Sequence, residues 1–139
     1  LVELKRFSEA LGLPLHLQPA HFPVPGDNAA RLILAVAARH GSDAAMQLTG
    51  AVLKAVWAEQ RNINDAATLA QLLAACGLPD AATADAQGDA VQQRYDQVTQ
   101  QAFDAGVFGA PSYVIDGEIF WGQDRLDFVE RRLAGLKSS

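Results

Sequence analysis

The residues best suited to hold a charged small molecule form one run near the C-terminus. The sequence WGQD, residues 121–124, opens an expected final helix. Unpaired backbone N–H groups and the positive end of a helix dipole suit a carboxylate, while the Asp124 carboxylate suits an ammonium group. The run therefore predicts recognition of both ends of a free amino-acid head group. Its four members are Trp121, Gly122, Gln123 and Asp124.

A second chemical feature is the dipeptide Ala110-Pro111, just before an expected strand. A proline cannot donate a hydrogen bond within a sheet, so Pro111 is expected at the start or edge of that strand. If the bond is cis, the peptide groups of Ala110 point outward and are free to pair with an extended peptide ligand. On residue type alone, Pro111 is equally well an ordinary edge proline, and Asp124 is more often a plain helix cap.

A β-hairpin and a helix are expected to position these residues. The segments SYVI and EIFW are rich in β-branched and aromatic residues, and Asp116-Gly117 between them suits a two-residue hairpin turn with two positive φ angles. Gly122 then ends the strand, and either Asp124 or Gln123 is expected to cap the final helix. The apolar residues of that helix recur at helical spacing: Leu126, Val129, Leu133 and Leu136.

The preceding residues predict an almost entirely helical block. Residues 1–11 have a helical apolar stripe that stops at Gly12, and residues 13–17 are expected to form a short edge strand. Between residues 28 and 105 the pattern predicts successive helices, with Asn28 and Asn64 as caps and with a helix break at Gly41. Alanine is frequent there, which lets helices approach closely.

Composition excludes several classes of function. The net charge of −5 and the absence of a basic cluster argue against a nucleic-acid partner, and no apolar run approaches the roughly 18 residues that suggest a membrane span. A single cysteine, Cys76, permits no internal disulfide and agrees with a reducing, cytoplasmic location. The three histidines lie in different predicted elements without metal-ligand spacing, so no metal is expected.

The order of these features resembles a known enzyme family. A helical insertion followed by GVFGAP, an Asp-Gly hairpin and FWGQDRL is similar to the 2-hydroxychromene-2-carboxylate isomerases and kappa-class glutathione transferases. The resemblance implies an α/β DsbA-like thioredoxin fold with a large all-helical insertion. On this basis residues 1–27 form a helix, a short strand and a linking loop, residues 28–105 the insertion, and residues 106–139 the C-terminal ββα half of the thioredoxin-like domain.

The resemblance also implies the ligand and the site. It implies a glutathione-dependent isomerase that works through a reversible glutathione adduct in aromatic catabolism, with a small aromatic substrate and a homodimeric assembly. Ala110 and Pro111 would meet the cysteinyl part of glutathione, and residues 121–124 its γ-glutamyl end, although the family usually has Asn or Ser at the position of Gln123. Phe22, in the PAHF loop, would line the organic substrate.

The family's catalytic serine, in a motif resembling D-x-x-S-P-x-S, has no match in this sequence. We therefore expect that serine upstream of Leu1, together with a βαβ unit missing from the chain, and we expect these residues alone to be inactive. Two alternatives stay open. A DsbA-family thiol-disulfide oxidoreductase would show a Cys-x-x-Cys pair before Leu1, and a non-catalytic helical binding module would bind no glutathione.

Overall fold

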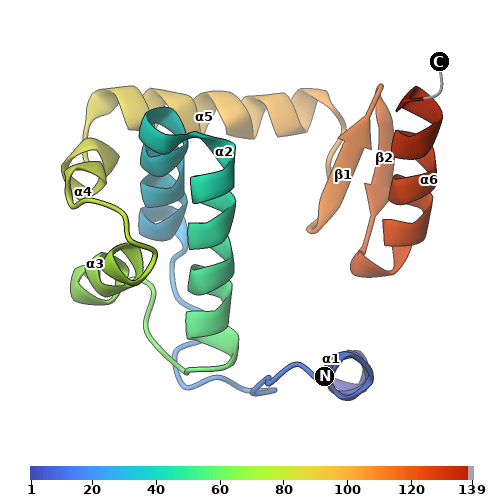
Figure 1. The fold of residues 1–139 in the computed structure, drawn as a ribbon, viewed down its shortest axis with the longest axis horizontal. Coiled ribbons are helices and arrows are strands. Elements are labelled where there is room, and N and C mark those ends of the chain that lie inside the picture. Colours follow the sequence, from blue (N-terminus) through green and yellow to red (C-terminus); the bar gives the residue numbers. More distant parts are fainter. Residues whose placement is uncertain (138–139) are drawn as a thin grey trace. The chain divides into compact units, whose positions relative to one another are not determined.

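The computed structural model describes residues 1–137, which form two compact units, Leu1–Tyr95 and a second unit that begins at Asp96 (Figure 1). The boundary falls inside a helix, so the domain limits expected at residues 28 and 106 stay predictions. The elements follow in this order: α1 (Val2–Leu11), α2 (Asp27–Trp57), α3 (Ala66–Ala75), α4 (Ala81–Ala86), α5 (Asp89–Asp104), β1 (Ser112–Ile115), β2 (Glu118–Trp121), the 3₁₀ helix η1 (Gln123–Arg125) and α6 (Leu126–Lys137).

Helix α1 ends at Gly12 as expected, with φ of 63° in the left-handed region. The edge strand predicted for residues 13–17 is wrong, because the backbone there pairs with helices. The N–H of Leu13 donates to the carbonyl of Ser8 at 3.0 Å, and the N–H of His16 donates to the carbonyl of Trp57 at 2.7 Å. The first bond belongs to the C-terminal end of α1, and the second fastens the loop to the end of α2.

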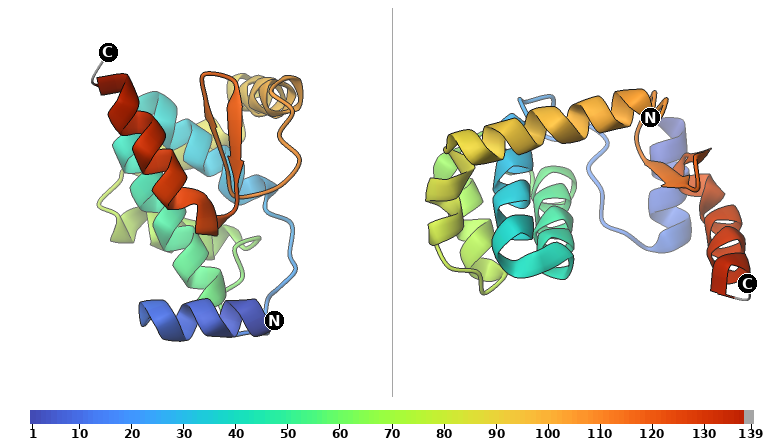
Figure 2. Two further views of the ribbon diagram at one scale, coloured as in Figure 1. Left: turned by 90° about the vertical axis from the view of Figure 1, so that its right-hand side faces the viewer. Right: turned by 90° about the horizontal axis from the view of Figure 1, so that it is seen from above.

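Helix α2 consists of two helical arms that lie side by side (Figures 1 and 2). Gly41, with φ of 86° and ψ of 177°, departs from helical geometry at the predicted break. Only glycine adopts this backbone region without strain, so the chain can reverse there. The predicted cap at Asn28 is wrong: the helix begins at Asp27, and the Asn28 Nδ2 donates instead to Asn64 Oδ1 at 3.2 Å.

Helix α3 is capped one residue later than predicted. Asp65, not Asn64, is its N-cap, and Asp65 Oδ2 accepts a hydrogen bond of 2.9 Å from the Thr68 N–H. This bond, and a second from the Thr68 hydroxyl, lower the pKa of the Asp65 carboxyl below its ordinary value. Asn64 makes other hydrogen bonds: its N–H donates to Asn62 Oδ1, and its Oδ1 accepts from Asn28 Nδ2.

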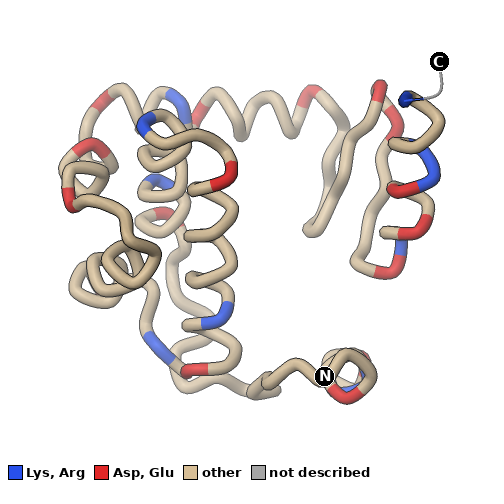
Figure 3. The backbone as a smooth tube through the Cα atoms, viewed as in Figure 1, with Lys and Arg blue, Asp and Glu red and all other residues tan. Residues whose placement is uncertain are grey.

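The packed core lies in the first unit. Both arms of α2, together with α3, α4 and the start of α5, contribute to one apolar cluster. Leu48, Leu73 and Val36 are its largest fully buried side chains, and alanines fill the closest approaches. Helix α4 is held against α2 by a two-pronged ion pair between Arg39 and Asp85, which lowers the pKa of Asp85. Helix α3 itself carries no charged residue (Figure 3).

The second unit contains the predicted hairpin. Strands β1 and β2 pair antiparallel, with Tyr113 opposite Phe120 and Ser112 opposite Trp121. Asp116 and Gly117 have the expected positive φ angles, 50° and 81°. Helix α6 packs on β1, and the guanidinium of Arg132 reaches the turn, where Nη2 lies 3.0 Å from Asp116 Oδ2.

The second unit buries little apolar surface by itself. Among its described residues only Val129 is buried, at 8% exposure. Large apolar side chains stay exposed on both the hairpin and the helix: Val114, Leu126, Phe128, Leu133 and Leu136. Acidic and basic residues are interspersed along α6 (Figure 3). No helix within residues 1–137 has the length and apolar character needed to cross a membrane.

Candidate functional site

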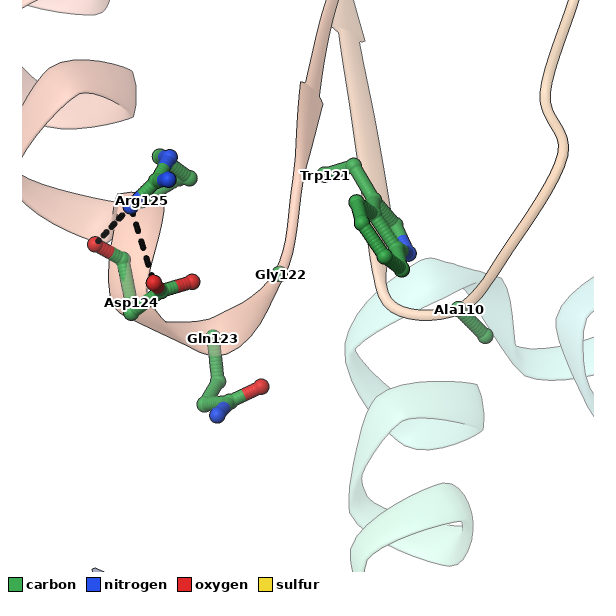
Figure 4. A pocket seen from close by; sticks show the side chains of 6 residues that line it. All are labelled: Ala110, Trp121, Gly122, Gln123, Asp124 and Arg125. Atoms are coloured by element: carbon green, nitrogen blue, oxygen red, sulfur yellow. Dashed lines mark hydrogen bonds and ion pairs between the residues drawn. The ribbon is translucent and has the colours of Figure 1, made fainter. Parts of the chain in front are cut away.

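A pocket of about 250 Å³ lies in the second unit, between the loop before β1 and the turn that leads into α6 (Figure 4). Five of the six residues predicted to bind glutathione line it, although they come from segments that are 11 residues apart in the sequence. The lining consists of Ala110, Trp121, Gly122, Gln123, Asp124 and Arg125. The sixth predicted residue, Pro111, does not line it, but adjoins it directly.

One wall of the pocket is the chain before β1. The Ala110-Pro111 bond is cis, and the Pro111 carbonyl accepts a 3.0 Å hydrogen bond from the Gly122 N–H. This bond joins the two walls, because Gly122 follows β2 directly. Within residues 1–137, no hydrogen bond involves the N–H or the C=O of Ala110, and this residue is exposed. A bound peptide can therefore pair with the Ala110 backbone.

The indole of Trp121 forms the apolar part of the lining. Of the two aromatic residues that end β2, Trp121 lies at the pocket and is half exposed, while Phe120 is more buried. A Cβ built on Gly109 would lie only 2.6 Å from Trp121 Nε1. Only glycine therefore allows the indole to lie this close to the chain, which explains the glycine at position 109.

The charged part of the lining comes from Asp124 and Arg125. The Arg125 Nη1 donates to Asp124 Oδ2 at 2.8 Å, and both side chains are about half exposed (Figure 4). A Cβ on Gly122 would lie 2.5 Å from Asp124 Oδ1, so the carboxylate also rests against the glycine. Gly122 has φ of 109°, which L-residues rarely adopt. The positive φ is what requires glycine here, and a Cβ would in addition displace the Asp124 carboxylate from its present position.

The prediction that Asp124 or Gln123 caps the final helix is wrong. Gly122 holds the cap position of η1, and no side chain makes a capping hydrogen bond there. The Asp124 carboxylate is directed to Arg125 instead, while the Gln123 side chain extends away from that ion pair (Figure 4). The partner of the carboxylate is therefore a half-exposed side chain and not the helix backbone.

Sequence reasoning missed Arg125 as a lining residue. The signal was present, since Arg125 follows Asp124 directly and a turn at Gly122 brings neighbouring side chains to one place. With Arg125 included, the pocket carries one carboxylate and one guanidinium. These two groups match the ammonium and the carboxylate of an amino-acid zwitterion.

The lining holds no serine, cysteine or histidine, so it suits binding rather than nucleophilic attack. Phe22, predicted to line the organic substrate, lies in the first unit and contacts Trp57 in a tilted arrangement with ring centroids 4.7 Å apart. Cys76 is half-buried beside the apolar core. Among residues 1–137, no three His, Cys, Asp or Glu side chains are grouped so that they would hold a metal ion.

Comparison with characterised proteins agrees with this architecture. The chain is 34% identical over 134 residues to a 2-hydroxychromene-2-carboxylate isomerase of Sphingobium xenophagum, with 96% of the chain and 66% of that protein covered. It is 27% identical over 136 residues to the 2-hydroxychromene-2-carboxylate isomerase of Pseudomonas putida, with 97% and 64% covered. The chain thus spans just under two thirds of the length of these relatives.

Solved structures show the same fold. A structure of 2-hydroxychromene-2-carboxylate isomerase superimposes with a TM-score of 0.75 at 28% identity, over 97% of the chain and 64% of that structure. A putative protein disulfide isomerase from Nitrosomonas europaea has a TM-score of 0.70 at 20% identity, over 88% and 59%. At that identity the likeness concerns the fold alone. The profile of the DSBA-like thioredoxin domain matches residues 1–134, and the chain therefore belongs to the DSBA-like thioredoxin domain family.

Proposed function

We propose that the complete gene product is a glutathione-dependent isomerase of the 2-hydroxychromene-2-carboxylate type. One observation carries the proposal: an unpaired peptide edge at Ala110 and a carboxylate at Asp124 line the same pocket. Glutathione needs both, because it is a peptide with a free amino-acid head group. The names of the relatives support an isomerase, and the family supplies the fold.

In this proposal glutathione lies across the pocket in an extended conformation. The cysteinyl residue pairs with the backbone of Ala110 beside Pro111, and the γ-glutamyl head group reaches Asp124, near Trp121 and Gln123. The Asp124–Arg125 ion pair is half exposed, and such pairs typically contribute only about 0–1 kcal/mol. The ligand's ammonium and carboxylate can therefore replace it at little cost, each taking one partner.

The chemistry proposed for the bound tripeptide begins with its thiolate. A serine, expected upstream of Leu1 from the family resemblance, would donate a hydrogen bond to the sulfur and lower the thiol pKa. No catalytic residue is proposed within residues 1–139. We accordingly propose that these residues alone do not catalyse the isomerisation, whatever they bind.

The thiolate would then add to the conjugated carbon–carbon double bond of the open form of an aromatic keto acid. A C–S bond forms, and the displaced electron pair moves onto the conjugated carbonyl oxygen as an enolate. Rotation occurs about the carbon–carbon bond that is now single. Return of the electron pair restores the double bond, breaks the C–S bond and releases the thiolate unchanged, so no oxidant or reductant is consumed.

We further propose a homodimer that works in the cytoplasm.

The test is glutathione binding to the complete gene product, measured by isothermal titration calorimetry. We expect Asp124→Ala to weaken binding at least about tenfold, because a hydrogen bond to a charged group contributes roughly 1.5–3 kcal/mol. The matched control is Asp127→Ala, which removes an exposed carboxylate from the first turn of α6 without touching the pocket. This control should bind glutathione within about twofold of the unaltered protein.

The proposal would be overturned by either of two results. One is an unaltered protein that binds no glutathione, and the other is an Asp124→Ala variant that binds it with unchanged affinity. A Cys-x-x-Cys pair directly before Leu1 in the complete gene would favour thiol-disulfide exchange instead.

A further inference from the structure

The candidate pocket contains two charged side chains, and they are paired with each other. Arg125 Nη1 lies 2.8 Å from Asp124 Oδ2 and 3.5 Å from the Asp124 carbonyl oxygen. The lining thus carries one negative and one positive charge, and each has the other as its partner (Figure 4). The remaining lining residues are uncharged: Ala110, Trp121, Gly122 and Gln123.

The position of the Asp124 carboxylate limits how a ligand can bind it. A Cβ on Gly122 would lie only 2.5 Å from Asp124 Oδ1, while Oδ2 accepts the hydrogen bond from Arg125. One oxygen therefore lies against the chain, and the other is taken by the guanidinium. A ligand ammonium group that takes the Oδ2 position displaces Arg125, and a ligand carboxylate that takes Nη1 displaces Asp124.

This displacement has different consequences for ligands with one charge and for ligands with two. A ligand that has only an ammonium group takes the carboxylate and leaves the guanidinium without its partner. A ligand that has only a carboxylate takes the guanidinium and leaves Asp124 without its partner. An amino-acid head group bears both charges on one carbon atom, so it gives each side chain a new partner. Complementarity of this kind contributes to specificity more than to raw affinity.

We propose that Arg125 is a specificity-determining residue, whose ion pair with Asp124 selects thiols with a complete amino-acid zwitterion over thiols with only one of these charges. Arg125 binds the ligand when the head-group carboxylate is present, and competes with the ligand for Asp124 when that carboxylate is absent. The inference rests on the proposed function, because glutathione is a thiol with such a head group. It adds a requirement for both charges at once, which glutathione binding alone does not imply.

The experiment measures the binding of three thiol peptides to the complete gene product by calorimetry. The probes are glutathione, 4-aminobutanoyl-cysteinylglycine, which lacks the head-group carboxylate, and glutaryl-cysteinylglycine, which lacks the ammonium group. All three share the thiol and the C-terminal glycine. The unaltered protein should bind each analogue at least about tenfold more weakly than glutathione, because each loses a hydrogen bond to a charged group.

Arg125→Gln should change the affinities of two of these peptides in opposite directions. Glutathione should bind about fivefold more weakly, because its carboxylate loses a charged partner. The aminobutanoyl peptide should bind about twofold to fivefold more tightly, because the ion pair that competes for Asp124 is gone. Asp124→Ala should show the mirror image, with weaker binding of glutathione and tighter binding of the glutaryl peptide.

Arg131→Gln is the matched control. It removes an exposed guanidinium that lies over the Phe128 ring on α6, in the same unit and outside the pocket lining. All three affinities should stay within about twofold of those of the unaltered protein. A general effect of lost positive charge would appear in both arginine variants. Far-ultraviolet circular dichroism checks that each variant is folded.

Three results would overturn the inference. If Arg125→Gln leaves the ratio of the glutathione and aminobutanoyl affinities unchanged, Arg125 does not select for the carboxylate. If the unaltered protein binds all three peptides equally well, no zwitterion is required. In the first case the proposed function stands as long as glutathione binds and Asp124→Ala weakens it. If the unaltered protein binds no glutathione, the proposed function and the inference fail together.

Discussion

The two units of this chain differ in how completely they bury their own apolar residues. In the first unit, five helical segments share one core, and Leu48, Leu73 and Val36 are fully buried. In the second unit, only Val129 is buried among the described residues, although the hairpin and α6 carry many large apolar side chains. The packed core lies in the first unit, whereas the candidate site lies in the second unit.

The candidate site is defined by short-range geometry and not by a packed core of its own unit. The pocket depends on backbone geometry at Gly109, Gly122 and the Ala110-Pro111 dipeptide rather than on dense packing. Short-range constraints of this kind act between neighbours in the sequence. The helical unit depends instead on side chains that meet from distant segments, so its formation is cooperative.

The largest expected effect compares the two sets of buried side chains. Leu48→Ala, in the core of α2, should lower the free energy of unfolding by about 2–5 kcal/mol, because it leaves a cavity in a packed interior. Val129→Ala should cost less than about 2 kcal/mol, because it deletes fewer carbons from a less enclosed position. Urea denaturation followed by circular dichroism measures both.

Met46→Ala, at an exposed position of α2, is the control and should stay within about 0.5 kcal/mol of the unaltered protein. Equal losses for the Leu48 and Val129 variants would contradict the contrast between the units. They would show that the buried side chain of the second unit contributes as much to the free energy of unfolding as one in the core of the first.

A smaller effect is expected from two glycines of the hairpin region. Gly122→Ala and Gly117→Ala both place a side chain at positive φ, and each should cost about 1–3 kcal/mol in stability. Only the Gly122 variant brings a Cβ within 2.5 Å of Asp124 Oδ1, whereas nothing lies within 4 Å of a Cβ at Gly117. Glutathione affinity should therefore fall at least about fivefold for Gly122→Ala alone.

Calorimetric titration of both glycine variants would decide this. Equal glutathione affinity in the two would show that the carboxylate position does not depend on the space at Gly122. Loss of affinity in both would attribute the effect to backbone strain in the hairpin rather than to the pocket.

The smallest expected effect concerns pH and the first unit. Hydrogen bonds from Thr68 lower the pKa of Asp65 below its ordinary value of 3.8, so the folded state binds this proton less readily than the unfolded state. The resulting stabilisation is present above about pH 4 and is lost as the pH falls through the lowered pKa of the folded state. Asp65→Asn cannot titrate, so its stability should decline less between pH 4 and pH 2.

The matched control is Asp43→Asn, at an exposed position of α2. Chemical denaturation at pH 7, 4 and 2 would compare the three proteins. An Asp65→Asn variant with the full acid sensitivity of the unaltered protein would contradict the role assigned to the cap.

Local signals in the sequence predicted the hairpin well. Asp116-Gly117 favours positive φ angles at both turn positions, and this preference acts within two residues. The helix ends at Gly12 and Gly41 follow from the same freedom of glycine. These elements needed no knowledge of what lies across the molecule.

The errors arose where a distant partner decided the outcome. Residues 13–17 have the composition of a strand, but a hydrogen bond from His16 to Trp57 holds them as a loop. Asn28 and Asn64 are good capping types, yet they bond to each other and leave the cap of α3 to Asp65. Propensity cannot foresee such pairs, because the competing bond comes from 36 residues away.

The site shows the same division. The residue types at Ala110, Pro111 and 121–124, with their resemblance to an isomerase family, were enough to nominate a binding pocket. Only the tertiary structure decided that Arg125 joins the lining, that Asp124 pairs with it instead of capping a helix, and that the Phe108 ring contacts the Trp121 ring at a tilt. Backbone preferences are set by neighbours along the chain, whereas the direction of a side chain depends on every group that meets it in space.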